Sequence, residues 1–189
     1  LAAAGNRDVG ESARIAANIL RAFTIDAENF GRVVDVLTQV QSNANTTVNA
    51  LGESFKQVSG TAAAYGISLE EVSAALGVLA NSGLSGSISG TSLNRLILEL
   101  VKNGEKLEPV LQKFGSSLDA IDVRKKSLLE IFQELERLTS QSQMFAQEFS
   151  AAMDMRGARA FLSIINQGVD SFEKLLDLTN NSTGVGGVV

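Results

Sequence analysis

Apolar residues recur at helical spacing along most of the chain, and short polar breaks separate the apolar stretches. In residues 9–23, and again in residues 30–40, the apolar residues fall on one face of a helix. The same spacing predicts about nine short to medium helices in all. The spacing is lost within residues 117–126, where we expect one short extended piece. The pattern therefore predicts an all-α fold, organised as a compact multi-helix domain.

Helix-boundary residues sharpen this prediction in the middle of the chain. Ser68 and Glu71 have the spacing of a capping box, in which the side chain of each residue bonds the backbone amide of the other. Gly66 and Gly83 suit positions just after two helix ends, because glycine adopts a positive φ at little cost. A helix bounded by these residues is the clearest element that the sequence predicts.

Gly83 and two further glycines raise the question of a ligand loop. Gly83, Gly86 and Gly90 are spread through a serine-rich stretch that precedes an apolar helical segment. A phosphate-binding loop places its glycines close together and follows them with lysine and then serine or threonine. Here the last glycine is followed by Thr-Ser without a lysine, which disfavours phosphate binding. We expect a joint that lets the helix of residues 68–82 fold back onto that of residues 91–102.

The chain divides into three segments. Residues 1–25 are expected to form an N-terminal helix that continues from a preceding segment, and residues 26–180 one core helical domain. Residues 181–189 are rich in glycine and are expected to be a flexible linker to the rest of the chain. Because the first residue is Leu1 rather than methionine, we expect a fragment of a longer polypeptide.

Composition removes several classes of function. The chain has no histidine and no cysteine, which excludes disulfides, Ser-His-Asp catalysis, and imidazole or thiolate metal ligands. A net charge of −5 gives no electrostatic footprint for nucleic acid or for an anionic membrane surface. No apolar run approaches the roughly 20 residues of a membrane-spanning helix. We therefore expect no enzyme activity, no cofactor, no metal and no membrane segment in this part of the protein.

Three features have both a chemical and a structural interpretation. Glu70 and Glu71 are a candidate carboxylate pair, but adjacent residues diverge by about 100° around a helix, which favours capping. The basic run in residues 122–126 suits a contact with phosphate or acidic protein, although a solvated loop is favoured. The methionines and phenylalanines of residues 144–161 suit core packing, with a hydrophobic partner surface as the alternative. Chemistry alone therefore indicates a helical packing or binding module.

Residues 27–100 resemble the core region of the tail tape measure proteins of long-tailed bacteriophages and of related phage-tail-like particles. The resemblance rests on the order of several short motifs, each of which alone would only mark a helix boundary. These motifs are Leu51-Gly52, Tyr65-Gly66, Ser68–Val72, Leu76–Gly83, and then Gly90, Thr91, Leu93 and Arg95. Residues 128–138 also resemble a later helix of this family.

The chain departs from the family pattern at two places. A Phe-Gly pair ending at Gly115 stands where the family has Leu-Gly. Met155, Arg156 and Gly157 stand where it has an aromatic residue followed by glycine, so this joint is expected to pack differently. An arginine at this joint, Arg156 or Arg159, is expected to bond helix-end carbonyls or to pair with Asp154, and not to act in catalysis.

The resemblance implies a structural role in a virion. It implies that the full-length protein lies in the tail lumen, sets tail length and assists DNA delivery. The core region is expected near the tip, where it anchors or initiates assembly with tip, baseplate and tail-tube proteins. Several copies are expected to associate in the lumen after assembly in the host cytoplasm. Arg95 is the first choice for a polar clasp on neighbouring backbone or on a partner chain.

Two other classes of function stay open on the sequence alone. One is a generic helical adaptor that binds a protein partner and has no tail-length role. The other is a membrane-active or lytic enzyme, because some family members carry peptidoglycan-cleaving domains. Such sites need a zinc ligand set or a positioned acid, and this chain has neither histidine nor cysteine.

Overall fold

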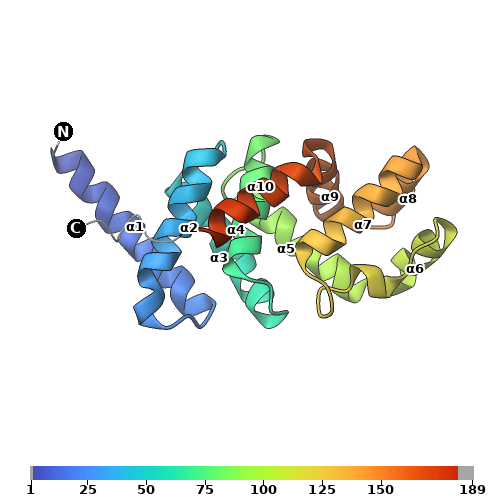
Figure 1. Cartoon of the computed structure of the whole chain (residues 1–189), viewed down its shortest axis with the longest axis horizontal. Coiled ribbons are helices and arrows are strands. Elements are labelled where there is room, and N and C mark those ends of the chain that lie inside the picture. Colours follow the sequence, from blue (N-terminus) through green and yellow to red (C-terminus); the bar gives the residue numbers. More distant parts are fainter. Residues whose placement is uncertain (1, 183–189) are drawn as a thin grey trace.

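Residues 2–182, the part that the computed structural model describes, form ten α-helices and two short 3-10 helices, and this part has no strand (Figure 1). Side-chain surroundings are described from residue 9 onward. In chain order the elements are α1 (Ala2–Ala22), η1 (Ala27–Asn29), α2 (Phe30–Asn43), α3 (Val48–Ala64), α4 (Leu69–Asn81), α5 (Ser87–Lys102), α6 (Gly104–Lys113), η2 (Leu118–Ile121), α7 (Leu128–Gln141), α8 (Gln143–Ala151), α9 (Met155–Gln167) and α10 (Val169–Asn180). The predicted all-α fold is confirmed, with one helix more than the sequence pattern indicated.

The predicted boundaries of α4 agree with the structure. Ser68 Oγ accepts a hydrogen bond from the Glu71 amide at 3.1 Å, and the Glu71 carboxylate accepts one from the Ser68 amide at 3.3 Å. Gly66 has a φ of 70° and Gly83 a φ of 92°, so each supplies the left-handed turn that follows a helix end. Local chemistry thus sets both ends of this helix.

The prediction of a short extended piece in residues 117–126 is wrong, because no strand forms there. The first part of this segment is the 3-10 helix η2, flanked by extended backbone at Ser117 and Asp122, and residues 123–126 form a turn and bend. The Asp122 carboxylate accepts a hydrogen bond from the Arg124 amide at 3.0 Å, and its carbonyl oxygen accepts one from the Lys126 amide at 2.9 Å. A carboxylate that bonds its own backbone two residues on favours a tight turn over a strand.

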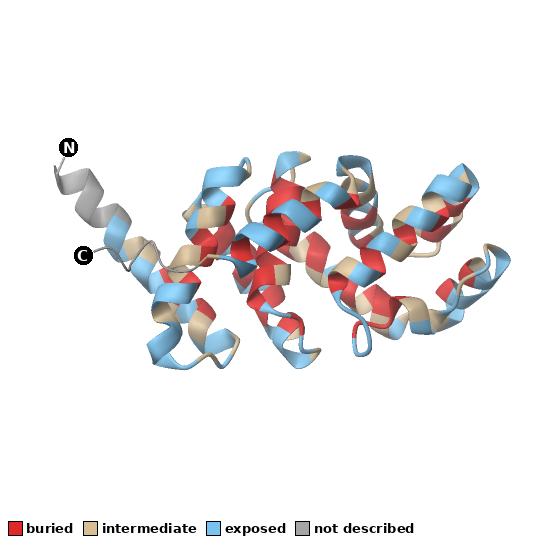
Figure 2. Ribbon diagram, in the orientation of Figure 1, coloured by how far each residue is buried: buried red, intermediate tan, exposed pale blue. Residues whose placement is uncertain are grey.

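Helix α4 lies at the centre of the molecule and is buried on nearly every side. Eleven of its thirteen residues are buried, which is why its sequence reads as almost continuously apolar (Figure 2). Helices α2 and α10 cover one side of it, and α9, α5 and α3 also pack against it. Helix α10, the last described helix, therefore packs against α2 and α4 from the first half of the chain (Figure 1).

One hydrophobic core runs from α1 to α10 without a break. At the α6–α8 end it contains the rings of Phe145, Phe149 and Phe161, with 5.0 Å between the centroids of Phe149 and each of the other two. Core packing, the favoured interpretation of this region, thus holds for the phenylalanines. Met144 and Met155 differ, because they are 56% and 75% exposed. Residues 183–189, most of the expected linker, lie outside the described residues.

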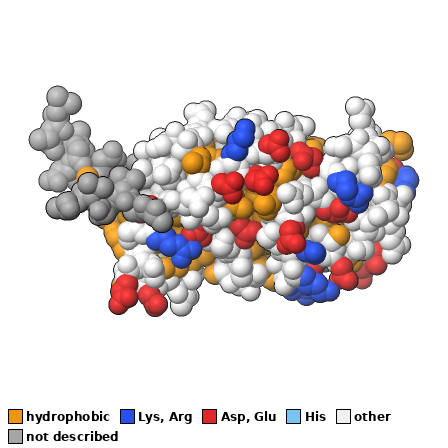
Figure 3. Space-filling model, in the orientation of Figure 1, with side chains coloured by type: hydrophobic (Ala, Val, Ile, Leu, Met, Phe, Trp, Pro, Cys, Tyr) orange, Lys and Arg blue, Asp and Glu red, His pale blue; other side chains and the backbone are white. Residues whose placement is uncertain are grey.

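The surface carries both signs of charge in small groups. On the face that carries α10, acidic side chains gather over the middle of the molecule (Figure 3). Asp170, Glu173 and Asp177 of α10 are exposed and follow one another at helical spacing. No helix in the described part of the chain is long and apolar enough to cross a bilayer.

Candidate functional site

The serine-rich stretch after α4 is a joint between helices, as predicted, but α5 begins earlier than expected. Gly86 has φ 64° and ψ −142°, a conformation that suits glycine, and α5 starts at Ser87 rather than at residue 91. Gly90 and Thr91 consequently lie inside the first two turns of α5. Helices α4 and α5 touch, yet α5 packs chiefly against α3 and α9. The joint therefore directs α5 away from α4.

Gly90 lies where the backbones of α3 and α5 cross. A Cβ atom at this position would overlap the backbone carbonyl of Ser54 in α3. Only glycine lets the two backbones approach this closely, and backbone cannot move aside as a flexible side chain can. The glycine of the Gly-Thr-x-Leu-x-Arg motif is thus explained by helix packing rather than by a ligand.

Buried hydroxyl groups complete this crossing. Ser54 Oγ donates to the Gly86 carbonyl oxygen at 2.6 Å, and Ser89 Oγ donates to the same oxygen at 3.0 Å. Both serines are 1% exposed. Since a buried polar group is costly without a partner, these bonds let the polar joint lie against the core.

Arg95 forms a polar clasp between helices, but with side-chain carboxylates of its own chain and not with backbone, which was one of the two expected partners. Its Nε lies 3.1 Å from Glu99 Oε1 and 3.6 Å from Oδ1 of Asp154, which caps the start of α9. The Glu99 carboxylate, 6% exposed, also accepts a bond of 2.5 Å from Asn103 Nδ2. That same amide nitrogen donates to the Ala152 carbonyl at the end of α8, at 2.9 Å. The clasp joins α5 to the end of α8 and the start of α9.

One of the two alternatives for the arginines of this joint, an ion pair with Asp154, is corrected. In the structure Asp154 pairs with Arg95 of α5, and not with Arg156 or Arg159. Arg156 contributes its backbone amide to Asp154 Oδ1 at 3.0 Å, while its side chain is exposed. Gly157 lies inside α9, where an added Cβ would meet Glu99 Cγ at 3.1 Å. Gly86, Gly90 and Arg95 thus lie along α5, and Gly157 packs against that helix from α9. Gly115, with a φ of 80°, follows the end of α6 elsewhere.

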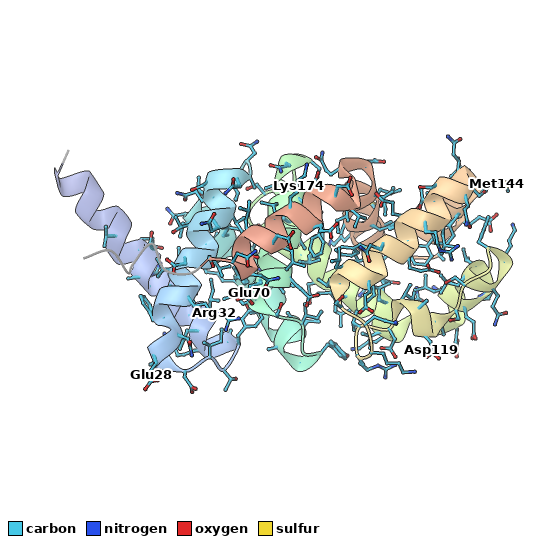
Figure 4. All side chains as sticks on the ribbon, in the orientation of Figure 1. Glu28, Arg32, Glu70, Asp119, Met144 and Lys174 are labelled. Carbon is cyan, nitrogen blue, oxygen red and sulfur yellow. The ribbon has the colours of Figure 1, made fainter. Side chains whose placement is uncertain are left out.

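Glu70 and Glu71 serve different neighbours, in line with the structural interpretation. Glu70, 3% exposed, accepts a hydrogen bond from Arg32 Nε of α2 at 2.7 Å (Figure 4). Glu71 Oε1 accepts a bond of 2.8 Å from the Leu128 amide at the start of α7. Glu71 therefore caps its own helix and a second one, because its other oxygen belongs to the capping box.

Two polar features of this kind were missed by the sequence analysis. Ser127 and Glu130 form a second capping box at the start of α7, and their Ser-x-x-Glu spacing is a signal that the sequence does carry. Glu136 Oε1 accepts a bond of 3.0 Å from the Val169 amide at the start of α10, and nothing local in the sequence indicates it.

The titratable groups favour structure over acid–base chemistry. Hydrogen bonds from the Arg124 side chain lower the pKa of Asp122, and those from the Arg137 side chain lower the pKa of Glu134. General acids that work near neutral pH have a raised pKa, which is the opposite direction. Among the described residues, no group of three or more Asp or Glu side chains is placed to hold a metal ion.

Fold and site together define a helical packing module. Its short helices are held together by close backbone contacts at glycine and by side chains of one helix that cap the end of another. The family of phage-related minor tail proteins matches residues 1–157, and the chain belongs to this family. The predicted resemblance is confirmed.

Two relatives carry more specific names. The "tape measure protein" of Pneumococcus phage Dp-1 is 26% identical over 190 residues, which cover 97% of this chain and 16% of that protein. The "probable tape measure protein" of Clostridium phage phiCD119 is 36% identical over 104 residues, which cover 55% of this chain and 11% of that protein. The chain thus spans less than a fifth of the length of these relatives. No solved structure matches the chain.

Proposed function

We propose that this chain is the helical core of a tail tape measure protein, with a structural and non-enzymatic role in a phage tail. The chain anchors or initiates tail assembly at the tip or baseplate, while the full-length protein sets tail length and assists DNA delivery. Its partners are tip, baseplate and tail-tube proteins, and several copies associate in the tail lumen after assembly in the host cytoplasm. Membership of the minor tail family and the names of the two relatives support this proposal.

The observation that carries the anchoring role is the packing of short helices around one core. A molecular ruler gains length from an extended helix, which advances 1.5 Å per residue. The longest helix here, α1 with 21 residues, spans about 32 Å. The other nine α-helices have between 9 and 17 residues, and the core ties all of them together. A body of this kind contributes a surface rather than a length.

The test is an in-frame deletion of residues 27–180 in the gene that encodes the chain, followed by electron microscopy of the particles. An anchor predicts that tails fail to form or that they end in defective tips. Intact tails that are shorter by about 1.5 Å for each deleted residue would show that the segment is part of the ruler. Normal and infectious tails would point to an adaptor without a role in tail assembly.

A substitution separates the same alternatives without changing the length of the chain. Gly90→Ala disturbs the crossing of α3 and α5, whereas Gly60→Ala places a Cβ in open space on α3. An anchor predicts tip defects for Gly90→Ala and normal tails for Gly60→Ala. A ruler predicts tails of normal length and form for both variants, since neither removes a residue.

A further inference from the structure

Two hollows adjoin along the exposed side of α5. The first, of about 390 Å³, is lined by Ser87, Ile88, Thr91, Ser92, Arg156 and Arg159. The second, of about 500 Å³, begins one turn farther along α5 at Arg95 and extends to Lys102 and Lys106, with the α8–α9 connection on its other side. The two hollows share no lining residue. They follow one another along α5, on either side of the place where Gly157 of α9 packs against Leu96 and Glu99, and we call the two together the α5–α9 groove.

Unpaired cations distinguish this groove from the rest of the surface. Lys102, Lys106, Arg156 and Arg159 are exposed, and none of them forms an ion pair within the described part of the chain. Most other cations there do pair, as Arg124 does with Asp122 at 2.8 Å. Four unpaired cations on one surface are unexpected in a chain with a net charge of −5. Their field attracts an acidic partner.

Apolar side chains lie among these cations. Ile88 is 53% exposed beside the first hollow, and Met155 is 75% exposed on α9. Leu162, two turns farther along α9, is 37% exposed. Exposed apolar residues rimmed by charge are typical of protein docking surfaces.

We propose that the α5–α9 groove docks an acidic, amphipathic helix of a partner protein. Helix α5 has 16 residues and is about 24 Å long, so the groove matches a partner helix of about four turns. Carboxylates of the partner pair with the four cations, and its apolar face covers the exposed Ile88 and Met155. The proposal concerns the chemistry of the partner and is independent of the role in tail length.

Nucleic acid fits the groove less well. The residues that line both hollows include no aromatic side chain on which a base would stack. Asp154, 41% exposed on its side chain, lies inside the second hollow and would repel a phosphate. A peptide helix fits a groove that carries both positive and negative side chains. Its carboxylates can face the cations while a neutral or basic side chain faces Asp154, whereas every phosphate of a nucleic acid is negative.

The test uses a fluorescently labelled, 16-residue helical peptide that carries glutamates along one face and leucines along the adjacent face. Fluorescence anisotropy measures its binding to the chain. We expect saturable binding that weakens as salt is raised, and at least tenfold weaker binding by a peptide with glutamine at each glutamate. In the groove variant, Lys102, Lys106, Arg156 and Arg159 are each replaced by glutamine, and affinity is expected to fall at least tenfold.

The matched control removes four cations elsewhere, by Lys56→Gln, Lys113→Gln, Lys125→Gln and Lys126→Gln, and keeps the same net charge as the groove variant. Its affinity is expected to change less than twofold, and circular dichroism checks that both variants are folded.

Equal losses in the two variants, or no binding of the glutamate peptide, would overturn the proposal. Tighter binding of a short DNA duplex would assign the groove to nucleic acid instead. Self-association that the groove variant abolishes, without peptide binding, would assign it to the acidic stripe of a second copy.

Discussion

At the scale of single residues, glycines have two separate roles in this molecule. Gly66, Gly83 and Gly86 have positive φ and turn the chain between helices. Gly90 and Gly157 lie inside helices, where the missing side chain lets another helix approach. Replacing a glycine of the first group by alanine strains the backbone, because a side chain disfavours positive φ. At the second group the same replacement causes a steric clash with the neighbouring helix.

Gly90→Ala tests the second role. The added methyl overlaps backbone at Ser54, so we expect the free energy of unfolding to fall by about 1–3 kcal/mol, or folding to fail. Gly60→Ala is the control, because this helical glycine of α3 has open space around its Cβ position and is exposed. It is expected to stabilise the chain by about 0.5–1 kcal/mol, since alanine favours helix. Urea denaturation measures both, and equal effects would contradict the packing argument.

Asp122 gives a prediction about acid. Its carboxyl pKa is lowered from the ordinary 3.8, first by hydrogen bonds from the Arg124 side chain, so the ionised form stabilises the folded chain. This contribution is complete above the ordinary pKa and is lost as pH falls through the lowered value. We expect Asp122→Asn to lower the free energy of unfolding at pH 7 and to make it less dependent on pH below about 4.

The control for this prediction is Asp119→Asn. Asp119 pairs with Lys125 at 2.5 Å, but its side chain is 77% exposed, and surface pairs of this kind contribute little. Urea denaturation at pH 7 and at acidic pH measures both variants. Parallel pH profiles for wild type and Asp122→Asn would contradict the assignment.

At the scale of elements, the ends of helices are bound to other helices through side chains. Glu71 of α4 reaches the start of α7, and Glu136 of α7 reaches the start of α10. Asn103, at the end of α5, donates to the carbonyl of Ala152, the residue that caps the end of α8. Because the first amides and last carbonyls of a helix lack partners within it, such bonds fix where one helix begins relative to the body of another.

Glu71→Ala tests this arrangement. It removes a reciprocal cap of α4 and the acceptor for the Leu128 amide, so we expect a loss of about 1–2 kcal/mol of stability. Glu130 holds the same position in the capping box of α7 and bonds no second helix in the described part of the chain, its one further contact being with the exposed Lys126 at 3.5 Å. Glu130→Ala is therefore expected to cost less. Thermal denaturation compares the two variants. An equal or larger loss for Glu130→Ala would show that the bond to Leu128 contributes nothing.

The helix boundaries also show how far the sequence predicts this structure. Ser68, Glu71, Gly66 and Gly83 act within a few residues of themselves, and their spacing was sufficient to predict them. The bond from Leu128 to Glu71 joins residues 57 positions apart, and no local spacing carries it. The ion pair of Asp154 with Arg95 likewise depends on which helices pack together. So does the close approach of α3 and α5 at Gly90. Periodicity gives the face of a helix that is buried, but not its partner.

At the scale of the whole molecule, one core joins all ten described α-helices, so the chain is expected to unfold as one unit. Leu175 of α10 is 5% exposed and lies against Gly77 of α4, so Leu175→Ala is expected to cost about 2–4 kcal/mol. Leu178→Ala, at a site that is 40% exposed on the same helix, should cost less than about 1 kcal/mol.

Two probes check that this loss is shared by the whole chain. Circular dichroism reports all helices, and fluorescence of Tyr65, the only tyrosine, reports the end of α3. The two transitions should coincide in wild type and in Leu175→Ala. Separate transitions would show that the molecule consists of independently stable parts.

The return of α10 to the side of α4 and α2 has a consequence for the time at which folding can finish. Roughly 90 residues separate the end of α4 from the start of α10, and a ribosome needs roughly 5–20 s to add them. Throughout that interval the apolar side of α4 that α10 covers lacks its partner. The nascent chain is therefore expected to expose this surface to other chains until α10 emerges, and rapid synthesis shortens the exposure.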